Sequence, residues 1–66
     1  MEIDVNGERQ TMVYPLTVAE LLCELAIDPK TVIVERNMKI LKREDHGAQS
    51  LAEGDVLEII QMVSGG

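Results

Sequence analysis

The sequence predicts a small α+β domain in which one main helix packs on one face of a mixed sheet of four to five strands. Sixty-six residues leave room for a single hydrophobic core. Only residues 17–26 carry apolar side chains at helical spacing, whereas the segments on either side alternate apolar and polar residues or are rich in β-branched residues. One helix among several strands therefore has to cover a single sheet.

The N-terminal segment predicts a β-hairpin. Apolar and acidic residues alternate over residues 1–5, which is typical of a strand with one buried face. Asn6-Gly7 follows directly and favours a type I′ turn, because both central positions of that turn need a positive φ. Residues 8–14 then return as the second strand, which Pro15 ends.

The helix is predicted to begin at Thr17, because Glu20 three residues later completes a capping box. One apolar stripe follows, formed by Val18, Leu21, Leu22, Leu25 and Ala26. Cys23 lies off this stripe. We expect Asp28-Pro29 to end the helix, since proline disfavours helical backbone in the residue before it.

Three further strands are predicted in the C-terminal half. Residues 31–34 are β-branched without a polar interruption, which suits a strand covered on both faces. A turn at residues 36–37 leads into a short strand around residues 40–41. Leu51 is expected to fill the core from a loop, and residues 56–63 form a long final strand.

Composition and charge exclude several classes of function. Tyr14 is the single aromatic residue, so the stacking surfaces that bind single-stranded nucleic acid cannot form. The net charge of −6 also opposes phosphate binding. One cysteine and one histidine exclude an internal disulfide and a Cys/His zinc site. No apolar run approaches the length of a membrane span, and the acidic N-terminus is unlike a signal peptide, so we expect a cytoplasmic protein without membrane, nucleic-acid or metal partners.

No catalytic constellation is evident. Cys23 and His46 have no partners close in sequence and are interpreted as a tolerated helix residue and a solvated loop residue. The acidic pairs at positions 44–45 and 53/55 are next to turns and are interpreted as solvated charges. We therefore expect that the chain alone is not an enzyme.

The C-terminal sequence is unusual. Glycine makes up about 7% of residues on average, so two terminal glycines occur by chance in roughly 0.5% of chains. Glycine has no Cβ, and the tail formed by Ser64, Gly65 and Gly66 could therefore enter a narrow channel that bulkier residues would block. The Gly66 carboxylate is a poor electrophile and would need activation, for example as an acyl-adenylate. A frayed end or a cloning remnant is the alternative.

The whole chain resembles the ThiS family of thiamine-biosynthesis sulfur carriers, which have the ubiquitin-like β-grasp fold. The matching features, in chain order, are the strand and Asn-Gly turn of residues 1–7, Val18 with Leu21-Leu22, residues 33–37, Arg43-Glu44, residues 54–59 and residues 63–66. Two positions depart from the family pattern. Lys42 stands where many relatives have proline, and Ser64 stands where alanine or glycine is frequent.

The resemblance implies a protein cosubstrate with a β-grasp domain over residues 1–63 and a flexible tail over residues 64–66. A ThiF-type adenylating enzyme would use ATP to adenylate Gly66. A sulfur relay from a cysteine desulfurase would then convert the adenylate to a thiocarboxylate, and thiazole synthase would accept the sulfur. No cofactor would bind the carrier itself, which is expected to be a monomer when free.

The sheet face opposite the helix is predicted to remain open for partners. Alternation in the last strand allows either of two sets to be exposed, Leu57/Ile59/Gln61 or Val56/Glu58/Ile60. The charge of Glu58 favours the second set. The predicted partner-facing residues are therefore Val56, Glu58, Ile60 and Met62. Arg36 and Arg43 are interpreted as solvated.

Three alternatives stay open. The small subunit of molybdopterin synthase is a related carrier with the same Gly-Gly end, although it tends to be longer and richer in aromatic residues, with a proline-containing stretch before the glycines. A ubiquitin-like modifier would instead join Gly66 to lysines of other proteins. A plain binding module would make no use of the tail.

Overall fold

A computed structural model gives the structure of residues 1–13 and 16–62. Tyr14, Pro15, Val63 and the predicted tail at residues 64–66 lie outside the described residues. The strands are β1 (Glu2–Val5), β2 (Glu8–Thr11), β3 (Val32–Arg36), β4 (Lys39–Leu41) and β5 (Val56–Gln61), and the helix is α1 (Val18–Glu24). Two short 3₁₀ turns, η1 (Pro29–Thr31) and η2 (Arg43–Asp45), complete the elements.

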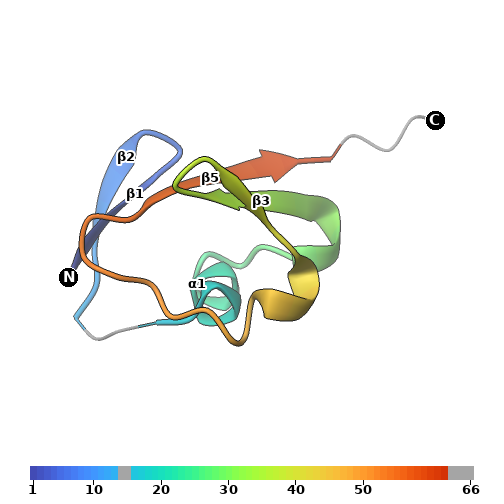
Figure 1. The fold of residues 1–66 in the computed structure, drawn as a ribbon, viewed down its shortest axis with the longest axis horizontal. Coiled ribbons are helices and arrows are strands. Elements are labelled where there is room, and N and C mark those ends of the chain that lie inside the picture. The colour runs from blue at the N-terminus through green and yellow to red at the C-terminus, as the bar shows by residue number, and fades with distance from the viewer. Residues whose placement is uncertain (14–15, 63–66) are drawn as a thin grey trace.

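The strands form one mixed sheet in the order β2-β1-β5-β3-β4, and α1 lies against one face of it (Figure 1). Strand β5 is the middle strand, parallel to β1 and antiparallel to β3. This arrangement confirms the predicted α+β class with a five-stranded sheet and one helix. The sheet face that points away from α1 is called the outer face below.

The two local signals at the start of the chain are confirmed. Asn6 and Gly7 have φ values of 53° and 83°, as the type I′ turn between β1 and β2 requires. In the capping box, the Thr17 N–H donates to Glu20 Oε1 (2.8 Å) and the Glu20 N–H donates to Thr17 Oγ1 (3.1 Å). The helix then buries the side chains of Val18, Leu21 and Leu22.

The predicted end of the helix is wrong: α1 stops at Glu24, before Asp28-Pro29. The Ala26 N–H donates to the Cys23 carbonyl (3.1 Å) and the Ile27 N–H to the Leu22 carbonyl (2.9 Å), which is the Schellman pattern. Ala26 therefore has left-handed backbone, with a φ of 57°. As a result Leu25 and Ala26, which were assigned to the apolar stripe, are exposed.

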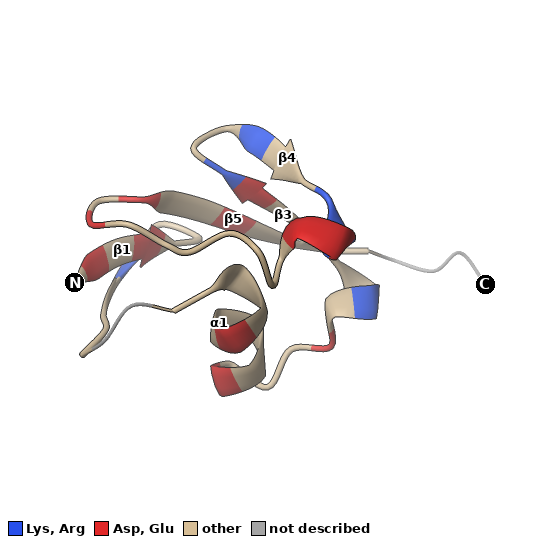
Figure 2. Ribbon diagram, turned by 60° about the horizontal axis from the view of Figure 1, so that its bottom comes forward, with Lys and Arg blue, Asp and Glu red and all other residues tan. Residues whose placement is uncertain are grey.

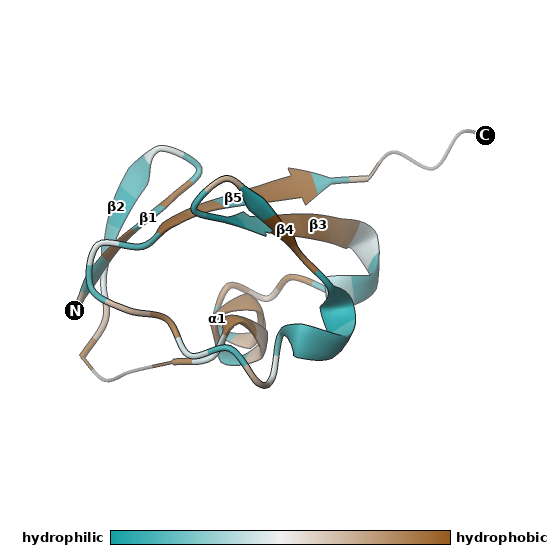
Figure 3. Ribbon diagram, in the orientation of Figure 1, coloured by the Kyte–Doolittle hydropathy of each residue, from teal (hydrophilic) through white to brown (hydrophobic). Residues whose placement is uncertain are grey.

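The core lies between α1 and the sheet. Its buried side chains are Ile3, Val5, Leu16, Val18, Leu21, Leu22, Val32, Val34, Leu51 and Leu57. Leu51 enters it from the loop, as predicted. The expectation that the third strand is covered on both faces is wrong, because Ile33 lies on the outer face and is 38% exposed. Figure 3 shows apolar residues on β3 and β5 as well as on the helix.

No helix within residues 1–13 and 16–62 is both long and apolar enough to cross a membrane.

Replacing Ala26 with Gly is expected to raise the free energy of unfolding by roughly 0.5–1 kcal/mol, because glycine adopts left-handed backbone without a Cβ clash. Urea or thermal unfolding measures the change. The control is Ala19→Gly, the same substitution at an exposed position inside α1, which should lower the free energy of unfolding by about 1 kcal/mol. Equal losses in both variants would contradict the left-handed assignment.

Candidate functional site

Strand β5 leads into the Gly-Gly tail and is held along both edges. Val5 of β1 is opposite Leu57, and Ile33 of β3 is opposite Ile60. Beyond the end of the strand, the Met62 N–H still donates to the Thr31 carbonyl (2.8 Å). The chain is therefore fixed up to Met62, the last described residue before the tail.

Asn6 extends the β1 edge after β1 has ended. Its Oδ1 accepts from the Ile59 N–H (2.7 Å), and its Nδ2 donates to the Ile59 carbonyl (3.3 Å). The side-chain amide therefore pairs with β5 as a peptide group of a neighbouring strand would. The sequence indicates Asn6 as a turn residue, but this second role depends on a residue 53 positions away and was missed.

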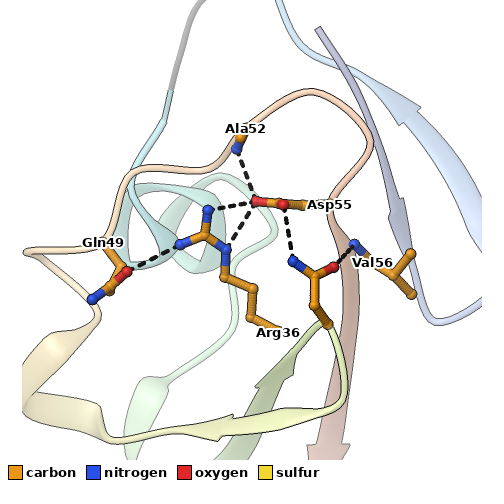
Figure 4. A network of polar contacts seen from close by, with 6 residues as sticks. Arg36, Gln49, Ala52, Asp55 and Val56 are labelled. Carbon is orange, nitrogen blue, oxygen red and sulfur yellow. Dashed lines mark hydrogen bonds and ion pairs between the residues drawn. The ribbon is translucent and has the colours of Figure 1, made fainter.

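A polar network fixes the start of β5 (Figure 4). One Asp55 carboxylate oxygen accepts from Arg36 Nε (2.9 Å) and Nη2 (2.8 Å) and from the Ala52 N–H (2.8 Å). The other accepts from Asn37 Nδ2 (3.1 Å), and Arg36 Nη1 donates to Gln49 Oε1 (3.0 Å). The interpretation of Asp55 and Arg36 as solvated is therefore wrong, since Asp55 is only 6% exposed and the two form an ion pair.

The same network reaches β5 itself through Asn37. Its Oδ1 accepts from the Val56 N–H (2.9 Å), and its own N–H donates to the Val56 carbonyl (2.7 Å). Asn37 and Met38, with φ values of 52° and 71°, form the turn between β3 and β4. The turn predicted at residues 36–37 is confirmed, although it lies at residues 37–38. It anchors Val56, the first residue of β5.

The environment of Asp55 favours its charged form. Burial by itself would raise the pKa of the carboxyl group. The hydrogen bonds from the Ala52 N–H and the Asn37 amide, together with the positive charge of Arg36, outweigh burial and lower the pKa below its ordinary value of 3.8. The carboxylate therefore stabilises the fold at neutral pH.

The structure confirms which residues of the last strand are exposed. Leu57 is fully buried, whereas Val56, Ile60 and Met62 are 42–44% exposed and Glu58 is exposed as well. Gln61, which was grouped with the inward set, is also exposed. That partners bind to this face stays a prediction.

The outer face extends further than the last strand. Ile33 of β3 lies opposite Ile60 and, on the next strand, Ile40 lies opposite Glu35 and is 70% exposed. Glu35 and Glu58 lie directly opposite each other. Figure 2 shows an acidic segment on each of these two strands. The sequence does not indicate Ile33, Glu35 and Ile40 as part of this face, because the strand register cannot be obtained from the sequence.

His46 is buried, not solvated as interpreted: it is 4% exposed, and neither ring nitrogen has a hydrogen-bond partner. Its loop folds against the start of α1, where the Ala19 N–H donates to the His46 carbonyl (3.0 Å). Cys23 is exposed on the helix. The part of the chain that the structure describes holds no group of three His, Cys, Asp or Glu residues that could bind a metal.

Comparison with known proteins identifies the family. The model of the ThiS family matches residues 3–66. The chain belongs to the ThiS family. A solved structure has the same fold. The crystal structure of the thiamine biosynthesis protein ThiS from Geobacter metallireducens superposes on this chain with a TM-score of 0.87, and the two sequences are 35% identical over the full length of both chains.

Two relatives of this ThiS-family chain differ in size. The sulfur carrier protein ThiS of Bacillus subtilis is 40% identical over 50 residues, which cover 76% of each chain. A thiazole synthase of Paramagnetospirillum magneticum is 36% identical over all 66 residues, but the present chain spans only 20% of its length. The family thus includes small proteins named as sulfur carriers, and a similar segment is found within a larger protein named as an enzyme.

Replacing Asp55 with Asn is expected to lower the free energy of unfolding at neutral pH by about 2–3 kcal/mol, because the Arg36 guanidinium loses its partner. The native pKa of Asp55 is below 3.8, so its contribution is present above that pH and is lost as the pH falls through the native value. The difference between the two proteins should therefore shrink toward about pH 3.

Urea unfolding at several pH values tests this prediction. Glu44→Gln, which neutralises an exposed carboxylate on η2, is the control and should change the stability by less than about 0.5 kcal/mol. If the Asp55→Asn difference were constant from neutral pH to about pH 3, the assignment of the charged pair would be wrong.

Proposed function

We propose that this ThiS-family chain carries sulfur on the carboxyl group of Gly66 and delivers it to thiazole synthase during formation of the thiamine thiazole ring. The observation that carries the proposal is the full-length match to a ThiS structure, in a chain whose middle strand leads into Gly-Gly. The match to the Bacillus subtilis sulfur carrier supports the same role.

The first step activates the carboxylate. On a ThiF-type adenylating enzyme, a carboxylate oxygen of Gly66 attacks the α-phosphorus of ATP, and pyrophosphate leaves. The product is an acyl-adenylate, whose acyl carbon is electrophilic and whose leaving group is AMP. The chain supplies only the carboxylate, because ATP binds to the enzyme.

The second step introduces sulfur. The terminal sulfur of a persulfide, supplied by a cysteine desulfurase relay, attacks the acyl carbon and displaces AMP. The resulting acyl disulfide is then cleaved by a thiol of the relay, which supplies the two electrons and becomes part of a disulfide. The terminal sulfur stays on Gly66 as a thiocarboxylate, which is a soft nucleophile.

Thiazole synthase is proposed as the acceptor on two grounds. The thiazole synthase of Paramagnetospirillum magneticum contains a segment similar to the entire chain, so a segment of this kind occurs within a protein of that name. The chain also has a structure suited to presenting its end to a partner. The β3 edge of β5 is hydrogen-bonded as far as Met62, and the opposite edge is held by β1 and Asn6 as far as Ile59, so the base of the tail has a fixed position on the domain.

Mass spectrometry of the protein isolated with its adenylating enzyme, ATP and a sulfur donor tests the proposal. Oxygen-to-sulfur exchange adds nearly the same mass as oxidation of a methionine, and the chain has four methionines. The shift must therefore be located on residues 64–66 by fragmentation and must respond to a thiol-alkylating reagent, with Cys23 accounted for. An unmodified tail, or conjugates to lysines of other proteins, would contradict the proposal.

Deletion of Gly66 is expected to abolish thiocarboxylate formation and growth without thiamine. Gly47→Ala is the matched control, because Gly47 is exposed, has no neighbour within 4 Å of an added Cβ and should tolerate the change. Growth supported by the deletion variant in a strain that lacks its own carrier would exclude the proposed use of the tail.

A further inference from the structure

We propose that the outer sheet face docks onto thiazole synthase and that the Glu35–Glu58 pair receives a Lys or Arg side chain of that enzyme. The inference rests on the proposed function. It adds which residues of the carrier make the contact and which chemistry the enzyme must present to them.

The two carboxylates lie among exposed apolar side chains of β3, β4 and β5, and the charged residues Asp4 and Arg9 continue the same face on β1 and β2. Glu58, Glu35 and Ile40 follow one another across β5, β3 and β4 in a single row. Ile60 and Ile33 form the next row of this face. The exposed apolar side chains around the pair are thus Ile33, Ile40, Val56 and Ile60.

The pair is unfavourable in the free protein. Residues directly opposite each other in antiparallel strands have Cβ atoms about 4.5–5.5 Å apart, and like charges at such positions destabilise the sheet. Among residues 1–13 and 16–62, neither Glu35 nor Glu58 has an ion-pair partner. Water screens the repulsion while the face is exposed.

A protein that covered the apolar side chains would also remove water from the two carboxylates. Buried charges are costly unless they are paired and hydrogen-bonded. The occupant must therefore bring a cation to this point. An arginine is well suited, because its planar guanidinium donates to carboxylates in pairs and its charge balances part of the repulsion.

This chemistry argues against other occupants. A second copy would bring four carboxylates together, between chains that each carry a net charge of −6. In the Paramagnetospirillum magneticum thiazole synthase, by contrast, covalent linkage keeps the rest of the enzyme close to a segment like this one. Thiazole synthase with an apolar surface around a basic side chain is therefore the occupant that the face fits.

The test compares two double variants with equal net charge. Glu35→Gln with Glu58→Gln removes the pair, while Glu8→Gln with Glu44→Gln neutralises two exposed carboxylates elsewhere. Titration calorimetry with thiazole synthase should show at least about tenfold weaker binding for the first variant at low salt and a change within about twofold for the second. The loss should shrink at high salt.

Two further measurements complete the test. The Glu35→Gln, Glu58→Gln variant should unfold at the same or a higher temperature than the wild type, so that weaker binding is not loss of fold. Ile33→Ser with Ile60→Ser should weaken binding at low and at high salt, because it removes apolar contact area.

Unchanged affinity and unchanged salt dependence in the Glu35→Gln, Glu58→Gln variant would overturn the inference. So would self-association of the wild-type chain that Ile60→Ser abolishes, because the face would then belong to a second copy. If either of these two results is found while the wild-type tail carries a thiocarboxylate, the docking inference is wrong but the proposed function still stands. If the wild-type tail is never modified, the proposed function itself fails.

Discussion

The carboxylate of Asp55 joins its own turn, before β5, to the end of β3 and the turn after it, 18–19 positions earlier in the sequence. It binds the guanidinium of Arg36 at the end of β3, the amide of Asn37 in the following turn and the backbone N–H of Ala52. Through Asn37, this network also fixes Val56, where β5 begins. Because β5 is the middle strand, its position determines where β1 and β3 pair.

The same strand has two roles in the proposed function. Its inward side chains, such as Leu57, form part of the core, while Glu58 and Ile60 lie on the outer face. A substitution at an inward-facing position of β5 can therefore affect stability, whereas a substitution at an outward-facing position can affect partner binding. The side-chain amide of Asn6 pairs with the backbone of Ile59 beyond the end of β1 and leaves the outer face uncovered.

Features that depend on residues close in sequence could be predicted from the sequence. Asn6-Gly7 and the Thr17/Glu20 capping box act within a few positions, and both are confirmed. The end of α1 could not be predicted, because Ala26 occupies a left-handed position where glycine is the usual signal.

Long-range features were out of reach for a different reason. Asp55 looks like an ordinary turn residue, and its pairing with Arg36 depends on how β3 and β5 are placed in the sheet. The opposition of Glu35 and Glu58 likewise depends on register, which alternation along one strand does not determine. Alternation did identify the exposed face of β5, because one charged residue, Glu58, was enough to choose between two faces.

Because the chain is fixed up to Met62, the remaining four residues set a limit on length. A fully extended segment of four residues spans at most about 14 Å. Any enzyme that reacts at Gly66 must therefore hold its reacting atoms within about that distance of Met62. An active site set deeper than this below the enzyme surface could be reached only if the carrier domain itself entered the opening.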